Sequence, residues 1–159
     1  KIKTIVNYLE VNKNIPIIFD LPIIKYKENL KLMKNKKKII SNFWPYIPPQ
    51  SCIAMRRDNF KKILNQINFK LFPDIWMDFR IALYLKYIEK KFFILNKNLT
   101  YYRQSPNMIS ANFKYLSASW WRRRIQAHNY VEYFFFKKKI KHTKNFDYFL
   151  TSFVNYLIK

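Results

Sequence analysis

The segment Ile15-Pro-Ile-Ile-Phe-Asp-Leu-Pro-Ile-Ile-Lys-Tyr26 decides the fold class, because its β-branched residues favour a strand. Pro16 and Pro22 interrupt it, and a proline has no N–H to donate to a neighbouring strand. We therefore predict a strand that enters a loop around Asp20 to Pro22. The prolines restrict this strand to the edge of a sheet or to a strand end.

Helical periodicity flanks this strand on both sides. Apolar residues at i, i+3, i+4 and i+7 predict one helix before it and one after it. They are Ile2, Ile5, Val6 and Leu9 in the first helix, and Phe60, Ile63, Leu64 and Ile67 in the second. Asp58 is a good N-cap for the second helix, and Asp74 for a third that runs to about Lys90.

The remaining chain changes from strands to helices. Two short strands are predicted at residues 92–95 and 99–102, around Asn96-Lys97-Asn98. Residues 112–137 have a helical pattern. A last helix carries an apolar face made of Phe146, Phe149, Leu150, Phe153, Val154 and Leu157. Strands mixed with helices through residue 103, followed by helices alone, predict an α/β unit with a helical C-terminal extension.

The composition excludes several classes of protein. Half of the 159 residues are apolar, which excludes disorder of the whole chain. No apolar run approaches the ~18 residues of a spanning helix. A single cysteine, Cys52, excludes a disulfide framework and suggests a reducing compartment. The sequence contains no glycine, so it has no glycine-rich phosphate-binding loop. We expect a cytoplasmic globular protein.

The net charge of +22 has two explanations. Such an excess favours polyanionic partners, namely nucleic acid, acidic lipid headgroups or phosphorylated substrates. Alternatively, an A/T-rich genome would supply many lysines and few glycines without any selection for partners. The seven arginines resist that bias and are therefore more informative than the 24 lysines.

Two carboxylates are candidates for acid–base chemistry. Asp74 and Asp78 are four residues apart, which places both on one face of the predicted first helical turns, where the helix dipole favours anions. Trp76 lies between them. The pair is either an N-cap with a surface acid, or it includes a general base for a hydroxyl nucleophile beside an aromatic wall.

Three successive segments resemble the second half of family 2 glycosyltransferases. They are Ser51-Cys-Ile-Ala-Met-Arg-Arg-Asp-Asn-Phe60, Phe72-Pro-Asp-Ile-Trp-Met-Asp-Phe-Arg80 and Leu99-Thr-Tyr-Tyr-Arg-Gln-Ser-Pro-Asn-Met-Ile-Ser110. In that family, paired cations precede an acidic pair that opens a helix, and a Tyr-Arg stretch leads to a turn. The resemblance implies the GT-A fold, a Rossmann-like α/β sandwich. Residues 1–110 would then be the C-terminal part of the catalytic domain, and residues 111–159 a helical extension.

The resemblance also implies roles for individual residues. Asp78 matches the acid that removes the proton from the acceptor hydroxyl in an inverting sugar transfer, and Arg103 would lie near the donor diphosphate. We place Asp74 and Trp76 on the acceptor side. Trp76 either stacks on a sugar face or is a core residue. The partners implied are a nucleotide-sugar donor and a glycan or lipid-linked acceptor, in cell-surface polysaccharide or lipopolysaccharide synthesis.

The sequence departs from the family pattern in several places. Met77 replaces the first acid of the pair, Gln104 and Ser105 stand where many members have a histidine, and Gln50-Ser51 replaces a glycine pair. The chain contains no Asp-x-Asp metal motif, and it resembles a transferase that begins just after that motif. A divalent metal ion, Mg²⁺ or Mn²⁺, is therefore expected in the full-length enzyme, and we expect no sugar transfer by residues 1–159 alone.

Two features favour other functions. Trp120-Trp121-Arg122-Arg123-Arg124 and Phe134-Phe-Phe-Lys-Lys-Lys139 interleave aromatic and cationic residues, as in modules that bind nucleic acid. The basic helices from residue 112 onward and the apolar face of residues 146–157 suggest peripheral attachment to the inner face of an anionic membrane. The alternative is that these helices pack on the α/β unit. Trp121, Arg124 and His128 also match a pattern of some bacterial family members that has no assigned role.

Overall fold

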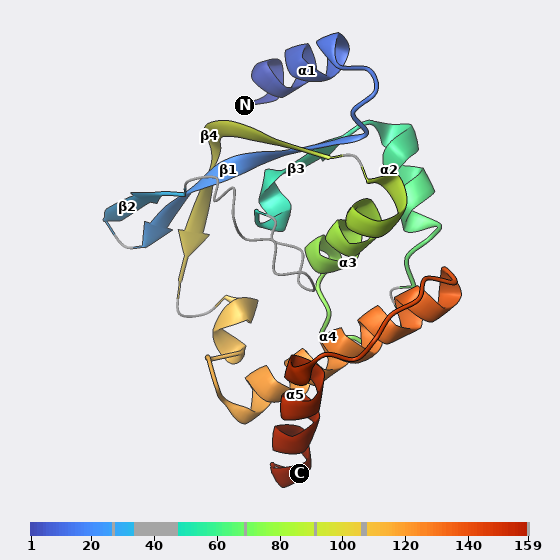
Figure 1. Cartoon of the computed structure of the whole chain (residues 1–159). Helices are drawn as coiled ribbons and strands as arrows, with labels where there is room; N and C mark the ends of the chain where they lie inside the picture. The colour runs from blue at the N-terminus through green and yellow to red at the C-terminus, as the bar shows by residue number, and fades with distance from the viewer. Residues whose placement is uncertain (27, 34–47, 69, 91, 106–107, 159) are drawn as a thin grey trace. The chain divides into compact units, whose positions relative to one another are not determined.

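The computed structural model describes the chain except for residues 27, 34–47, 69, 91, 106–107 and 159 (Figure 1). The described part is mixed α/β, with a four-stranded sheet and five α-helices. Its contacts divide it into two compact units. Unit 1 comprises residues 1–68 and 77–105, and unit 2 comprises residues 69–76 and 106–159. The predicted division at residue 110 stays a prediction, and residues 69–76 group with the C-terminal helices.

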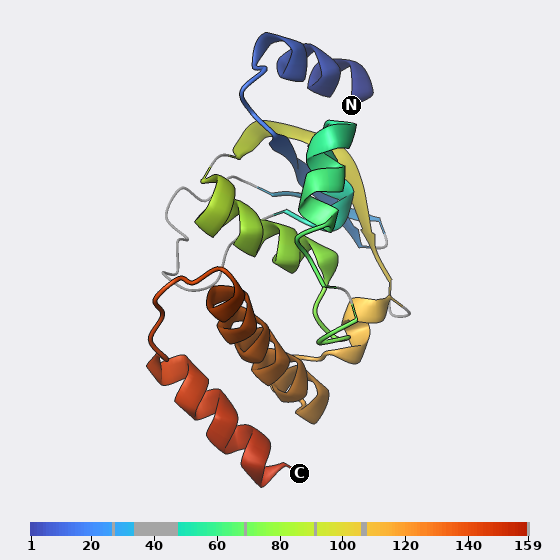
Figure 2. The ribbon, with the colours of Figure 1, turned by 90° about the vertical axis from the view of Figure 1, so that its right-hand side faces the viewer.

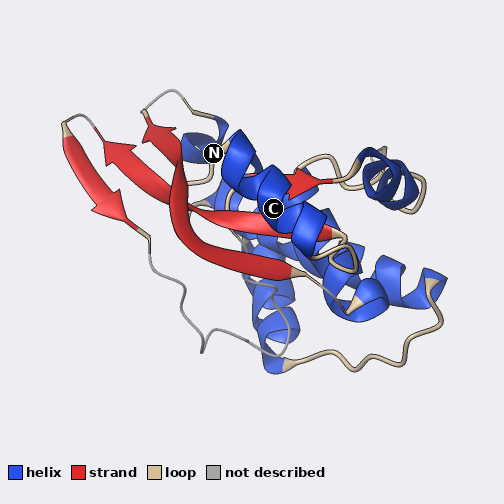
Figure 3. Ribbon diagram, turned by 90° about the horizontal axis from the view of Figure 1, so that it is seen from above, coloured by secondary structure: helices blue, strands red, loops and turns tan. Residues whose placement is uncertain are grey.

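The sheet of unit 1 is built around strand β1, Ile17–Tyr26. Strand β4, Phe93–Gln104, runs parallel to β1 along one edge. Two antiparallel strands share the other edge. Strand β3, Ile53–Met55, pairs with the first residues of β1, and strand β2, Asn29–Leu32, pairs with the last ones. Figure 3 shows the four strands side by side.

The prediction that β1 breaks at Asp20 to Pro22 and lies at an edge is wrong, because β1 is continuous and central. Pro22 is tolerated because it lies in the gap between the residues that pair with β3 and those that pair with β2. Its pairing with β4 falls at a register shift. The carbonyl of Pro22 accepts hydrogen bonds from Met33 N at 3.2 Å and Asn98 Nδ2 at 3.0 Å.

The two short strands predicted around residues 96–98 are one strand, β4. Phe19 pairs with Ile94 and Leu21 pairs with Asn98, so three residues of β4 lie opposite Asp20 alone. Residues 95–97 therefore form a bulge next to Asn98, and the chain does not reverse there.

Three helices complete unit 1. Helix α1, Ile2–Val11, packs Ile5 and Leu9 against Ile18 and Leu95. Figures 1 and 2 show α1 on one side of the sheet, and helices α2 and α3 on the other. Helix α2 spans Arg57–Leu64, and helix α3 spans Met77–Tyr84 and continues as a π-helical turn, Leu85–Glu89.

Both predicted N-caps of these helices are wrong. The N-cap of α2 is Arg56, and Asp58 lies in the first turn. Helix α3 begins at Met77, so Asp74 lies in the turn before it. The helix dipole favours an aspartate at any position within about one turn of the helix start. The presence of an aspartate in the sequence therefore does not identify the N-cap residue.

Unit 2 contains two long helices joined by residues 138–145. Helix α4, Ala118–Lys137, follows a 3₁₀ turn, Ile109–Asn112, and begins later than the predicted residue 112. Ser117 caps it by accepting a hydrogen bond from Trp120 N at 3.2 Å. Helix α5, Phe146–Leu157, packs on α4 and is capped by Asn145. No helix in the described part of the chain is both long enough and apolar enough to cross a membrane.

Candidate active site

Asp78 lies in the first turn of α3 in unit 1, as the resemblance implied for an acid that opens a helix. Its side chain is half-buried, and its Oδ1 accepts a hydrogen bond from Phe79 N at 2.8 Å. The dipole of α3 stabilises negative charge at this end of the helix. The position therefore suits an anionic proton acceptor.

A second segment of unit 1 reaches the start of α3. Gln50 begins a short 3₁₀ turn, Gln50–Cys52, and its Nε2 lies 3.6 Å from Met77 Sδ. Both Gln50 and Ser51 are exposed. The turn that stands in place of the family's glycine pair therefore borders the helix that carries Asp78.

Behind this turn lies a buried polar cluster that the sequence analysis missed. Asp20 is fully buried in β1, where its Oδ2 accepts a hydrogen bond from Thr100 Oγ1 at 2.6 Å. Lys1 Nζ lies 2.9 Å from Asp20 Oδ1, and it also contacts Thr100 Oγ1 and donates to Ser51 O at 2.7 Å. Burial, followed by the charge of Asp20, raises the pKa of the Cys52 thiol. Cys52 is therefore held as an unreactive thiol.

Arg103 lies near the end of β4 with an exposed side chain. Its register partner on β1 is Lys25, which is also exposed. Residues in register on neighbouring strands project on the same side of the sheet, so two cations stand side by side. An anion bound between them would offset their repulsion with charge-assisted hydrogen bonds.

Asp74 and Trp76 belong to unit 2, whereas Asp78 belongs to unit 1. The prediction that Asp74 and Asp78 share one face of a helical turn is wrong, because α3 begins at Met77. Asp74 forms a reciprocal pair with Gln126 of α4: Asp74 N donates to Oε1 at 3.2 Å, and Gln126 Nε2 donates to Asp74 Oδ2 at 2.6 Å. Trp76 is half-buried, and the guanidinium of Arg123 lies 3.4 Å from its ring centroid. A sugar could stack only on the other face of this ring.

Asp74 also lines a cavity of about 860 Å³ in unit 2. Its wall includes a guanidinium, amides and aromatic rings, from Arg122, Gln126, Asn129, Phe113 and Tyr156. Its volume falls within the range of small-molecule sites. The polar side chains suit a ligand with many hydroxyl groups, and nothing in the sequence pattern placed these residues together.

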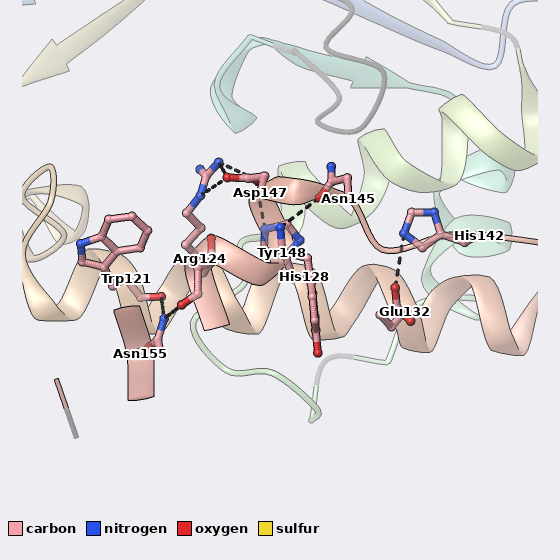
Figure 4. A network of polar contacts seen from close by, with 10 residues as sticks. Trp121, Arg124, His128, Glu132, His142, Asn145, Asp147, Tyr148 and Asn155 are labelled. Atoms are coloured by element: carbon pink, nitrogen blue, oxygen red, sulfur yellow. Dashed lines mark hydrogen bonds and ion pairs between the residues drawn. The ribbon is translucent and has the colours of Figure 1, made fainter. Parts of the chain in front are cut away.

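The Trp-x-x-Arg-x-x-x-His pattern serves to hold α5 on α4 (Figure 4). Arg124 Nη2 donates to both carboxylate oxygens of Asp147 at 2.6 Å, and His128 Nε2 lies 3.1 Å from Asp147 Oδ2. Asn155 Nδ2 donates to Trp121 O at 2.9 Å. These contacts give the pattern a structural role.

His128 is neutral at physiological pH. Burial lowers its pKa from 6.5 to about 4, against the opposing effect of the Asp147 carboxylate, and the charge of Arg124 lowers it further. The imidazole is 1% exposed, so a charged form would lose nearly all its hydration.

We expect the free energy of unfolding to decrease as the pH is lowered, because of His128. The unfolded chain binds a proton below about pH 6.5, but the folded chain does so only near pH 4. The contribution of His128 is complete above about pH 6.5 and falls by about 2–3 kcal/mol as the pH drops toward 4. Urea unfolding at about pH 7.5 and about pH 4.5 measures it. The variant His128→Gln should lose less stability between these pH values than the wild type, and an equal loss would contradict the assignment.

Several side chains of the two aromatic and cationic stretches make contacts within unit 2. Arg123 covers Trp76, Arg124 pairs with Asp147, and the core includes Phe134 and Phe135. These contacts leave fewer groups for nucleic acid than the sequence suggested. Nucleic-acid binding stays an untested alternative.

Among the described residues, no group of three or more His, Cys, Asp or Glu side chains could hold a metal ion. The turn predicted after Arg103 includes Pro106 and Asn107, which lie outside the described residues.

Comparison with protein-family models, with curated proteins and with solved structures found no match. The resemblance to family 2 glycosyltransferases therefore stays a prediction.

Proposed function

We propose that this chain forms the C-terminal half of an inverting, nucleotide-sugar-dependent glycosyltransferase of the family 2 type, with a GT-A fold. The observation that carries the proposal is the position of Asp78 in the first turn of α3. A mixed α/β sheet flanked by helices is compatible with half of a Rossmann-like sandwich. The product would belong to a cell-surface polysaccharide or lipopolysaccharide.

In the proposed reaction, Asp78 accepts the proton of the acceptor hydroxyl. The oxygen attacks the anomeric carbon of the donor sugar and forms the new glycosidic bond. The bond between that carbon and the diphosphate oxygen breaks, and the diphosphate leaves with the electron pair. The described residues offer no group of three or more His, Cys, Asp or Glu side chains that could hold the expected Mg²⁺ or Mn²⁺.

The position of Arg103 beside Lys25, near the ends of β4 and β1, supports a donor-binding role for Arg103. Lys25 beside it provides a second cation on the same side of β1 and β4. A diphosphate carries enough charge to engage both side chains. We therefore extend the predicted donor contact to Lys25.

Asp74 supports an acceptor site in unit 2. Its carboxylate lines the polar cavity, whose amides and rings suit a sugar-like ligand. The proposed acceptor contact of Trp76 is limited to the ring face that Arg123 leaves uncovered.

The variant Arg103→Gln should raise the KM for the nucleotide-sugar donor by about ten-fold or more, with a smaller change in kcat, because it removes a charged hydrogen bond to the diphosphate. Release of nucleoside diphosphate by the complete gene product measures both constants. Lys97→Gln is the matched control, since it removes another exposed cation of the same strand. Equal effects of the two variants would contradict a specific role for Arg103.

A further inference from the structure

Helix α5 packs with its polar side inward. The buried residues of α5 are Thr151 and Asn155, and its large apolar residues are exposed, except Val154, which is half-buried. We define the α5 stripe as Phe146, Phe149, Leu150, Phe153 and Leu157. Their exposed fractions are 80%, 58%, 41%, 61% and 64%. Their spacing places all five on one face of the helix, opposite Thr151 and Asn155.

Polar contacts fix this orientation. Asp147 pairs with Arg124 through two hydrogen bonds of 2.6 Å, and Asn155 donates to Trp121 O at 2.9 Å. Rotating α5 to bury the stripe on α4 would break these contacts and would place Asp147 away from its partner. The exposure of the stripe is therefore built into the packing of α4 and α5.

An exposed apolar face of this size indicates an interaction surface. Burying a large apolar side chain is favourable by roughly 1.5–3 kcal/mol, and the stripe leaves several such side chains in water. Contiguous exposed apolar patches in proteins commonly mark sites for a partner or a membrane.

The positive charge of the segment that precedes the α5 stripe favours an anionic partner. Residues 137–144, which lead into α5, contain five lysines and no acid. The one acid of α5, Asp147, is neutralised by Arg124. A second copy of the chain would bring the same charge of +22, so electrostatic repulsion disfavours self-association through this face.

We propose that the α5 stripe docks on an anionic lipid bilayer, with α5 lying in the plane of the interface. Exposed Phe and Leu side chains would insert at the boundary between headgroups and acyl chains. The neighbouring lysines would lie among the acidic headgroups, where each cation adds to binding at low salt. This proposal does not depend on catalysis, because lipid binding is measured without sugar transfer.

Vesicle flotation of the complete gene product tests the proposal, with phosphatidylcholine vesicles that contain about one third phosphatidylserine. The variant Phe149→Ser/Phe153→Ser should bind these vesicles at least about ten-fold more weakly than the wild type. Leu30→Ser/Leu32→Ser is the matched control, because it removes two exposed apolar residues from β2 and should leave binding unchanged. An unchanged melting temperature shows that each variant is folded.

A second variant tests the electrostatic part. Replacing Lys137, Lys139 and Lys141 with glutamine should weaken binding to the acidic vesicles by about ten-fold or more at low salt. Wild-type binding should be much weaker to vesicles of phosphatidylcholine alone.

Four results would overturn the proposal. Three are absence of wild-type binding to the acidic vesicles, equal binding by the Phe149/Phe153 variant, and equal binding to neutral vesicles. The fourth is a wild-type dimer that the Phe149/Phe153 variant converts to monomers, which would assign the stripe to a second copy instead. Sedimentation velocity without lipid makes that measurement.

Discussion

The variant Asp78→Asn is expected to lower kcat for sugar transfer by about 10²- to 10⁴-fold in the complete gene product, which is the usual contribution of a general base. Asparagine has nearly the same shape as aspartate, and its side-chain oxygen can still accept the hydrogen bond from Phe79 N. The start of α3 should therefore stay intact, while the proton acceptor is lost. The KM for the donor should change little, because Asp78 is proposed to act on the acceptor hydroxyl.

The matched control for this variant is Asp58→Asn. Asp58 also lies in the first turn of a helix, α2, and its side chain is exposed. Both substitutions remove one negative charge near a helix N-terminus, so they should change stability by similar small amounts. Only Asp78→Asn should remove activity. Transfer by Asp78→Asn at the wild-type rate would exclude Asp78 as the base.

The second large effect is expected for Asp147→Asn, which should lower the free energy of unfolding by about 2 kcal/mol. The substitution removes the charge that binds Arg124 and His128 together. Because α5 turns its apolar side outward, little apolar contact with α4 replaces this interaction. We therefore expect α5 to open locally before the rest of the protein unfolds.

Urea unfolding measures the loss of stability, and hydrogen exchange of the α5 amides measures the opening. Glu132→Gln is the control, because it removes a single and longer contact with His142, at 3.3 Å, and should change stability by less than about 0.5 kcal/mol. Equal effects of the two variants, or protection of α5 in Asp147→Asn, would contradict the role of Asp147.

The sequence predicted strands in the regions of β1 and β4 and the three helices of unit 1, because their patterns are local, but it did not predict the short strands β2 and β3. It did not predict the pairing of β1, because the two partners on one edge are separated in the chain. The gap between β2 and β3 accommodates Pro22, which local propensity treats as a strand breaker. The bulge at residues 95–97 likewise depends on pairing with β1, so the local pattern predicts two strands where there is one.

The candidate site was predicted in part. The placement of Asp78 at a helix start followed from its sequence neighbours. The assignment of Asp74 to the same helical face required a helix that begins at Asp74, whereas α3 begins three residues later, at Met77. Periodicity correctly gathered the apolar residues of α5 on one face, yet it carries no information about which face is buried. That choice depends on Arg124 and Asp147, which are distant in sequence.

The central proposal is that this chain is part of a family 2 type catalytic domain, and the resemblance implies an Asp-x-Asp metal motif just before residue 1. The most direct measurement is the coding sequence immediately upstream of Lys1, read in the same frame. The account predicts a strand-rich segment that ends in Asp-x-Asp shortly before Lys1. A stop codon, or an initiating methionine directly before Lys1, would contradict the account.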